Sequence, residues 1–575
     1  MKQTIDFLNG TCCDLSRPGR GTLPTRRVGQ KMDSAAAAAD PVIPPSPTPF
    51  DLAASRIDNL GIGSWPARRA RVRPDAVAWE FEGAERTYLE VHERTNRLAN
   101  ALRAAGIEPG DRVAYTGFNH PALLEVFFAC GMVGAAAVLV NPRLSGAEVA
   151  YILADSGARL CVYGEAQVAN VEGHLIHAVG VVESWIHVDE PAAGADGPAY
   201  EDFLATGSPV WGSAAVPLEA TALIMYTSGT TGRPKGAMLS HRALFYQNVN
   251  ALIGQDLRQD EHHLVCAPLF HIAGLNMMTL PTFTLGGRLL IQRGFDAPTV
   301  LRTLEERQVT SAFFVPAMLD AVSQQPRFAE ADLSSVRALM VGGSPLPDRT
   351  IATWAAKGIP LMQGFGMTET APGTRMLEPR DNVHKSGSVG RPHFFTDSVV
   401  VGFDGPASPG EAGEILIAGP NVMTGYWNLP EASAEALADG WYHSGDVGIS
   451  DEEGYLFVKD RVKDMYISGG ENVYPAEVEN SLLQLDGVRD CAVIGVPDGR
   501  WGESGVAYVE PAAGAELDGA ELRERLRERL AGYKLPREVV IVAAIPRNAT
   551  GKIQKFRLRE QFAADNQQGP DPARP

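Results

Sequence analysis

Short apolar runs alternate with longer helical stretches between about residues 55 and 460. Five of these runs end at Gly or Pro: Arg112–Gly117, Arg159–Gly164, Ser311–Pro316, Arg337–Gly343 and Ile359–Gly364. The intervening segments are typical of helices, for example 121–138, where small residues permit close packing. Strands that alternate with helices predict βαβ units and largely parallel sheets. Ligands bind such sheets at the carboxyl ends of the strands, where Gly-rich loops follow several of these runs.

A different pattern follows residue 463 and predicts a separate small α+β unit. Pro475–Leu485 has a helical pattern and Cys491–Val496 that of a strand. Leu522, Leu526 and Leu530 are spaced four residues apart, which predicts one charged helix with a narrow apolar stripe.

Neither the apolar runs nor the N-terminus predicts a membrane segment. The longest uncharged apolar run, 126–140, is shorter than the roughly 18 to 20 residues that cross a bilayer. It predicts a buried helix that leads into a core strand. Residues 1–50 carry scattered basic residues, an alanine run and several prolines, but no apolar signal core, and predict a disordered tail. Met32 is a second candidate start, in which case residues 1–31 would not belong to the native protein.

Composition narrows the classes of function. Hydrophobic residues make up 45% of the 575 residues, which is enough for large cores. Lys and Arg number 51 against 69 Asp and Glu, so the net charge is −18 and no global field attracts nucleic acid or an anionic bilayer. The six cysteines form no C-x-x-C pair, which indicates free thiols, a reducing cytoplasm and no zinc site.

The strongest chemical signal is the segment Tyr226–Gly236, YTSGTTGRPKG. Seven of its eleven residues are Ser, Thr or Gly, and Lys235 follows. Backbone N–H groups, hydroxyls and one lysine together make a phosphate cradle. The spacing differs from that of the Walker motif, since two residues separate Gly229 from Gly232 and a glycine follows Lys235. The alternative, a flexible linker, is disfavoured by the preceding strand-like run and the Pro-Lys-Gly ending.

At this motif the sequence resembles the adenylate-forming superfamily of acyl-CoA synthetases, aryl-CoA ligases, adenylation domains and luciferases. Further motifs of that superfamily follow in order: 342–346 (GGSPL), 363–370 (QGFGMTET), 442–446 (YHSGD), 460–464 (DRVKD), 468–475 (SGGENVYP) and 546–552 (PRNATGK). The resemblance covers about residues 55–562. Among the branches, the sequence is most similar to bacterial, especially actinobacterial, fatty-acid–CoA ligases.

The resemblance implies an α/β fold. It implies a large N-terminal AMP-binding domain of stacked αβαβα sheets with a small β-barrel-like subdomain, over residues 51–462. A small, mobile α+β C-terminal domain would follow at 463–565, with disordered tails at 1–50 and 566–575. The hinge between the domains would be Lys463.

The resemblance also implies the nucleotide site. Residues of the phosphate cradle, two Gly-rich loops and a later acidic motif would bind ATP and Mg²⁺: Thr227, Ser228, Gly229, Thr230, Thr231, Gly232, Lys235, Gly343, Ser344, Pro345, Gln363, Gly364, Phe365, Asp446 and Arg461. Bare backbone at the glycines can lie flat against adenine, and Asp446 can accept hydrogen bonds from ribose hydroxyls. Thr368 would contact the α-phosphate. Glu369, with Thr227, would hold the metal, because hard oxygen ligands suit Mg²⁺.

The catalytic residues implied by the resemblance are Lys552, Thr368, Glu369 and His271. Lys552 would offset charge that develops during acyl transfer. His271 would gate the acyl pocket, although a lone histidine in an apolar stretch is more often a core residue. Ser468, Gly469 and Gly470 would line the path of a pantetheine arm.

These features predict a two-step ligase. A carboxylic acid attacks MgATP to give acyl-AMP and pyrophosphate, and coenzyme A then accepts the acyl group. Small residues in the implied pocket favour a fatty acid. An aryl-acid ligase and a stand-alone enzyme that loads a carrier protein remain alternatives, and a homodimer stays open. A binding-only relative is disfavoured, because Lys552, Glu369 and Asp446 are all present.

Overall fold

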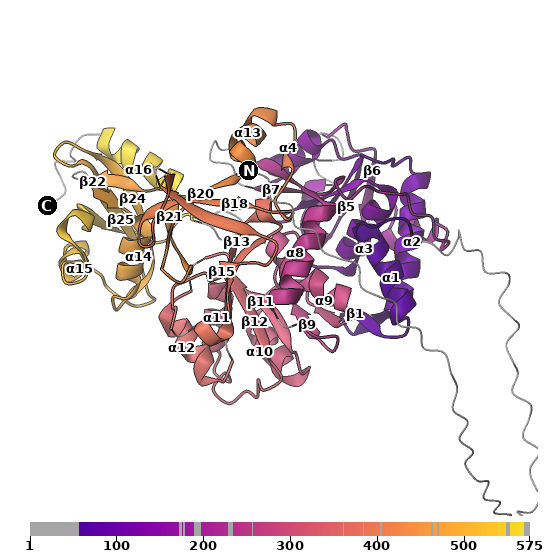
Figure 1. The fold of residues 1–575 in the computed structure, drawn as a ribbon, viewed down its shortest axis with the longest axis horizontal. Coiled ribbons are helices and arrows are strands. Elements are labelled where there is room, and N and C mark those ends of the chain that lie inside the picture. The colour runs from indigo at the N-terminus through magenta and orange to yellow at the C-terminus, as the bar shows by residue number, and fades with distance from the viewer. Residues whose placement is uncertain are drawn as a thin grey trace, which may run out of the picture. The chain divides into compact units, whose positions relative to one another are not determined.

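The computed structural model describes residues 57–567, apart from 172–174, 176–178, 189–196, 228–233, 256, 345, 360, 383, 403–404, 462–463, 469–470 and 548–552. It contains four sheets, two large and two small (Figure 1). Within the described part of the chain, no helix is both long and apolar enough to span a bilayer.

The first large sheet has nine strands. Its order is β15 (Arg391–Pro392), β14 (Gly373–Leu377), β13 (Leu361–Gly366), β12 (Ala338–Gly342), β11 (Ser311–Phe314), β9 (His262–Val265), β10 (Arg288–Ile291), β1 (Val77–Phe81) and β2 (Ala84–Thr87). The central strands from β13 to β1 are parallel, so their carboxyl ends share one edge of the sheet. The outer strands are antiparallel.

The second large sheet has seven strands. Its order is β19 (Gly425–Tyr426), β8 (Lys235–Ser240), β7 (Thr221–Thr227), β4 (Ala136–Val140), β3 (Arg112–Thr116), β5 (Leu160–Tyr163) and β6 (Ser184–His187). The strands from β7 to β6 are parallel, whereas β8 and β19 are antiparallel to their neighbours.

Helices pack against both large sheets. The main helices of this part are α1 (Trp65–Val72), α2 (Tyr88–Ala104), α3 (Pro121–Val133), α4 (Gly146–Ser156), α7 (Tyr200–Ala205), α8 (His241–Gly254), α9 (Leu280–Leu285), α10 (Ala297–Glu306), α11 (Pro316–Ser323), α12 (Asp348–Ala356) and α13 (Pro430–Ala436). Helix α8 contacts β8 of one sheet and β14 of the other. One hydrophobic core spans both sheets, which agrees with the expected stacked arrangement.

The two smaller sheets differ in character. One is antiparallel throughout, in the order β17 (Gly405–Pro406), β16 (Asp397–Gly402), β18 (Ala412–Ala418), β20 (Tyr442–Ser450) and β21 (Leu456–Arg461). The other comprises β23 (Glu471–Val473), β22 (Tyr466–Ser468), β25 (Gly502–Pro511), β24 (Val488–Asp498) and β26 (Glu538–Ile541). Helices α14 (Pro475–Leu483), α15 (Gly519–Leu526) and α16 (Lys555–Gln567) accompany it, so this is the smaller C-terminal α+β unit.

The predicted strands all form, but three helices are shorter than their sequence patterns suggest, and α14 ends at Leu483 instead of Leu485. Helix α3 ends at Val133 because Gly134 adopts a left-handed conformation (φ 88°), and the rest of the predicted 121–138 helix becomes β4. Helix α15 ends at Leu526, so Leu530 lies beyond it and packs only partly buried against the same core. The regular spacing of the three leucines therefore predicted a longer helix than the structure has.

The four cysteines among the described residues are buried free thiols, as expected: Cys130, Cys161, Cys266 and Cys491. Burial in apolar surroundings raises the pKa of Cys130 and of Cys266 to about 12. These thiols are therefore unreactive in the folded protein.

Candidate active site

Two strand ends from different sheets meet at the centre of the candidate site. Strand β7 ends at Thr227, and the short 3₁₀ turn η5 (Thr368–Thr370) follows β13. The Thr227 hydroxyl donates a hydrogen bond of 3.5 Å to Oε1 of Glu369. The fold thus brings together the two residues that the sequence predicted as metal ligands.

Glu369 is buried, and its carboxylate is held by a second hydroxyl. The hydroxyl of Tyr426, in β19, donates to the same Oε1 at 3.0 Å. Tyr442, the first residue of β20, is a second buried phenol close enough to Tyr426 and Glu369 for both to act on its pKa. Burial, reinforced by the charge of Glu369, raises the pKa of both tyrosines far above the ordinary value, so both remain protonated donors.

Glu369 differs from the other buried acids of the described chain in having no cationic partner there. Five buried carboxylates form ion pairs with arginine: Glu80 with Arg288 and Arg307, Glu125 with Arg94, Glu261 with Arg337, Asp446 with Arg461, and Glu510 with Arg489. Glu369 has only hydroxyl partners among the described side chains. A buried carboxylate with an uncompensated charge fits a divalent cation.

This donor set suits magnesium better than a transition metal. Mg²⁺ in nucleotide sites is held by one or two carboxylates together with substrate phosphates. The described residues contain no cluster of three His, Cys, Asp or Glu side chains that would form an all-protein metal cage.

Asp446 and Arg461 face each other across the neighbouring strands β20 and β21. They are register partners, and Nε of Arg461 lies 3.0 Å from Oδ1 of Asp446. The charge of Asp446 acts on Tyr442, and that of Arg461 acts on Tyr426. The predicted ribose residues therefore lie beside the Glu369 network.

The glycine loops form a surface that is poor in side chains at the carboxyl ends of β12 and β13. Gly342 pairs with Gly364 in register, and a Cβ on Gly342 would approach the Gly364 carbonyl oxygen to 3.2 Å. Gly343 has φ +90°, which favours glycine, and Ser344 is exposed beside it. A flat ligand such as a purine can approach such a surface.

The side chain of Gln363, unlike the residues that follow it, points into the protein. It is buried and donates a hydrogen bond of 2.6 Å to Oδ1 of Asn382. Any contact of this segment with adenine would therefore come mainly from the backbone of Gly364 and from the half-buried Phe365.

His271 and Lys235 are both accessible to a ligand. His271 is exposed and precedes a π-helix, η4 (Gly274–Thr279), so it is not a core histidine. Lys235, in β8, places its ammonium group 5.1 Å from the ring centre of Tyr426. Thr368 is half-buried in the turn that carries Glu369.

Several predicted site residues lie outside the described residues: Ser228, Gly229, Thr230, Thr231, Gly232, Pro345, Lys463, Gly469, Gly470 and Lys552. Ser468, next to the glycine pair, is buried at the end of β22 and pairs in register with Gly502.

The sequence analysis did not identify Tyr426 and Tyr442 as site residues. Tyr442 opens the YHSGD motif, which was a usable signal. Tyr426 carried no such signal, because it lies 57 residues from Glu369 and only the pairing of β19 with β8 brings it there.

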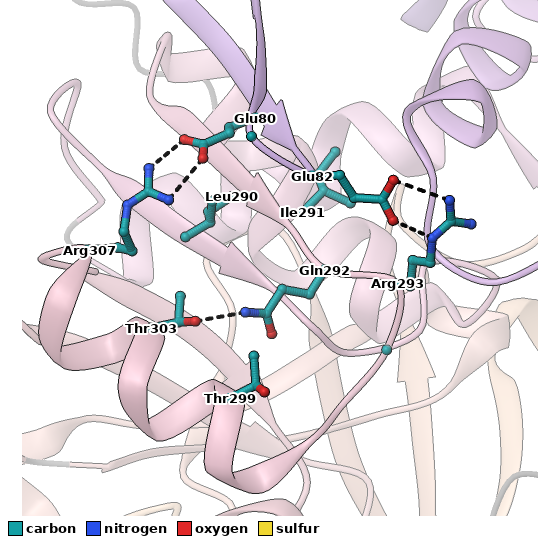
Figure 2. Close-up of a pocket in the computed structure, with 11 residues that line it drawn as sticks. Glu80, Glu82, Leu290, Ile291, Gln292, Arg293, Thr299, Thr303 and Arg307 are labelled. Atoms are coloured by element: carbon teal, nitrogen blue, oxygen red, sulfur yellow. Dashed lines mark hydrogen bonds and ion pairs between the residues drawn. The ribbon is translucent and has the colours of Figure 1, made fainter.

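A surface pocket of about 420 Å³ at the ends of β1 and β10 contains none of these residues. Its charges are paired internally, Glu80 with Arg307 and Glu82 with Arg293 (Figure 2). Gln292 donates to Thr303 at 2.8 Å in the same pocket. The pairing indicates a structural role.

Comparison with known families agrees with this geometry. The family model for AMP-binding enzymes matches residues 66–427, and the model for their C-terminal domain matches residues 477–552. The chain therefore belongs to the AMP-binding enzyme family. It is an acyl-CoA synthetase of the adenylate-forming superfamily, that is, an AMP-forming acid–thiol ligase.

Relatives with different named substrates are similar over nearly their whole length. A feruloyl-CoA synthase from an Amycolatopsis species is 49% identical over 88% of this chain and 99% of its own. A long-chain-fatty-acid–CoA ligase of Mycobacterium tuberculosis is 39% identical over 88% and 99%. The solved o-succinylbenzoate CoA synthetase of Bacillus subtilis, in complex with its acyl-adenylate, has a TM-score of 0.77 and 31% identity over 86% and 98%.

Proposed function

We propose that the protein activates an apolar carboxylic acid with ATP and transfers the acyl group to coenzyme A. The observation that carries this proposal is the buried carboxylate of Glu369, which has no cationic partner among the described residues and lies beside Thr227 at the start of the phosphate cradle. A bound Mg²⁺ would neutralise phosphate charge there. The acid attacks the α-phosphorus of ATP, pyrophosphate leaves, and the CoA thiol then displaces AMP from the acyl carbon.

The chain supplies positioning and charge, and no enzyme nucleophile is required. The cradle 227–232 and Lys235 would hold the phosphates, and Thr368 the α-phosphate. Asp446 and Arg461 would hold the ribose. The glycine surfaces at 342–345 and 363–365 would take the adenine.

For the acid we propose an aromatic substrate of the hydroxycinnamate class. The 49% identical relative is named for feruloyl-CoA. Next to Gly364, where the acid would lie, the methyl ends of Met340 and Met277 fill the space that a side chain would take. Flexible, polarisable methionines make favourable contacts with aromatic rings.

A fatty acid, which the sequence analysis favoured over an aryl acid, is the second candidate. The 39% identical relative from M. tuberculosis is named for long-chain fatty acids. The buried residues Met277, Met278, Phe313 and Met318 offer an apolar lining that would also suit an alkyl chain.

A panel of acids in a pyrophosphate-release assay with CoA tests these assignments. We expect ferulate and p-coumarate to exceed octanoate and dodecanoate in kcat/KM by about tenfold. Affinity that instead climbs along a fatty series, by about 0.8 kcal/mol per CH₂, would favour the second candidate. Pyrophosphate release with none of these acids would contradict the proposed function. The same assay with a phosphopantetheinyl carrier protein in place of CoA shows which of the two thiols accepts the acyl group.

The position of the acid is tested by Gly364→Ala. The added methyl must displace the flexible end of Met340 into the space assigned to the acid. We expect a lower kcat/KM for ferulate while the Kd of AMP and the melting temperature stay unchanged, because the adenine would contact only the backbone of Gly364. Gly499→Ala is the control, because a methyl there meets nothing within 4 Å.

The proposed hinge at Lys463 and the catalytic role of Lys552 are tested by separating the half-reactions. Lys552→Ala should slow acyl-AMP formation by about 10²–10³-fold. The same variant, given synthetic acyl-AMP and CoA, should form thioester at nearly the normal rate. Gly469→Leu should show the reverse pattern, because it narrows the proposed pantetheine path. Equal damage to both steps by Lys552→Ala would contradict domain rotation between 51–462 and 463–565.

We place this reaction in the cytoplasm, and the four buried free thiols support that location.

A further inference from the structure

We propose that Tyr426 is a positioning residue that orients the carboxylate of Glu369 toward the metal–nucleotide complex. Tyr442, the neighbouring buried tyrosine, would in turn help to position Tyr426. This inference rests on the proposed function, because it assigns a cation to Glu369. It adds two residues that the sequence analysis had not assigned to the site.

The hydrogen bonds on Glu369 are one-sided. Tyr426 and Thr227 both donate to Oε1, at 3.0 and 3.5 Å. No side chain or backbone group in the described part of the chain donates to Oε2. The two donors therefore fix the rotation of the carboxylate and leave Oε2 for the cation.

The direction of the hydrogen bonds follows from the chemistry of the groups. An ionised carboxylate only accepts, so the single proton of the Tyr426 hydroxyl points to Glu369. The lone pairs of the Tyr426 oxygen remain available to the neighbouring buried hydroxyl of Tyr442. Since Tyr426 and Tyr442 are both buried, water cannot easily replace either hydroxyl.

The backbone fixes the same geometry. The N–H of Met423 donates to the carbonyl oxygen of Glu369 at 2.8 Å, three residues before Tyr426. Tyr426 is itself anchored by the pairing of β19 with β8, the strand that carries Lys235. Tyr442 begins β20, the strand that carries Asp446. The two tyrosines thus join the phosphate, metal and ribose parts of the proposed site.

Neutral donors suit this task, because they orient the carboxylate without cancelling its charge. An arginine at the same place would give a stronger hydrogen bond, but it would repel the cation. Partners of metal ligands typically change metal affinity by about 10–100-fold when they are mutated.

The test is Mn²⁺ binding to the full-length protein with a non-hydrolysable ATP analogue, measured by electron paramagnetic resonance. In Tyr426→Phe, which keeps the ring beside Lys235, we expect the Kd of Mn²⁺ to rise about tenfold. AMP affinity without metal should stay within about twofold of wild type, because the nucleotide contacts are untouched. Tyr442→Phe should shift the Mn²⁺ Kd in the same direction by a smaller factor.

The matched control is Tyr455→Phe. Tyr455 is also buried, and its hydroxyl donates to the carboxylate of Asp381 at 2.7 Å, outside the proposed site. This variant should leave the Mn²⁺ Kd unchanged. An unchanged Kd in Tyr426→Phe would overturn the inference. If Tyr426→Phe does not fold, an unchanged Kd in Tyr442→Phe overturns it instead.

Glu369→Gln separates this inference from the proposed function. If Glu369→Gln weakens Mn²⁺ binding and Tyr426→Phe does not, only the positioning role fails. If Glu369→Gln leaves Mn²⁺ binding unchanged, the metal assignment itself fails.

Discussion

Two buried glutamates associated with the nine-stranded sheet are held in opposite ways. Glu80, in β1, accepts two hydrogen bonds from Arg307, at 2.8 and 2.6 Å (Figure 2). It also pairs with Arg288. Glu369, after β13, accepts hydrogen bonds only from hydroxyls within the described residues. Both carboxylates are more than nine-tenths buried.

The difference shows what each carboxylate is for. An ion pair with guanidinium groups compensates the desolvation of Glu80 and leaves it no charge to offer a ligand. The described residues offer Glu369 only hydroxyl groups, which orient the carboxylate without compensating its charge, and this costs stability in the absence of a cation. Burial alone therefore does not identify a functional acid, whereas burial without a cationic partner does.

The largest expected effect is that of Glu369→Gln on activity. The amide keeps the shape of the side chain but loses its charge, so acyl-AMP formation should fall at least about a hundredfold. Thermal stability should stay the same or rise slightly, because an uncompensated buried charge has been removed. Pyrophosphate release and a melting curve measure the two effects, and a strongly lowered melting temperature would contradict the comparison.

Glu80→Gln should have the opposite effects: it should lower the stability of the protein and leave its activity unchanged. Arg288 and Arg307 would lose their partner, but both are partly exposed, at 28% and 42%. We therefore expect a loss of about 2 kcal/mol in unfolding free energy, less than for a fully buried pair. Urea unfolding measures the loss. Under conditions where the variant is fully folded, it should form acyl-AMP at the wild-type rate. A loss of activity under those conditions would contradict a structural role for Glu80.

The contribution of Glu80 should depend on pH. Hydrogen bonds from Arg307, and further ones from Arg288, hold the pKa of Glu80 below its ordinary value. A lowered carboxyl pKa means that the stabilisation is complete above the unfolded-state pKa of about 4.3 and is lost as the pH falls through the folded-state pKa. The stability difference between wild type and Glu80→Gln should therefore be constant from about pH 6 to 8 and shrink toward pH 3. Urea midpoints across this range measure it, and a difference that grows on acidification would contradict the assignment.

The sequence predicted the parts of the site that depend on local pattern. The strands before the glycine loops form as expected, Thr227 contacts Glu369, and Asp446 pairs with Arg461, while the roles of these residues stay predictions. Local motifs were sufficient to select these residues, although β7, β13 and the antiparallel pair β20–β21 belong to three different sheets and only the packing of the sheets brings them together.

Contacts between distant segments could not be predicted in this way. The partners of Glu80 lie 208 and 227 residues away in the sequence, and Tyr426 lies 57 residues from Glu369. Only the order of strands in the folded sheets brings these groups together. The end of α15 was predicted wrongly for another reason. Leu530 continues the apolar spacing of Leu522 and Leu526, but the helix ends at Leu526.

The smallest expected effect concerns the sharing of Glu80 between two arginines. Arg307→Lys keeps the positive charge but replaces a bidentate pair with a single ammonium contact, while Arg288 stays in place. Because Arg307 is 42% exposed, the loss should be at most about 1 kcal/mol. Arg327→Lys is the control, since Arg327 pairs with Glu305 at the surface and should lose almost nothing. If Arg307→Lys costs as much as Glu80→Gln, then Arg288 contributes nothing to holding the carboxylate. Glu80 would in that case depend on a single arginine.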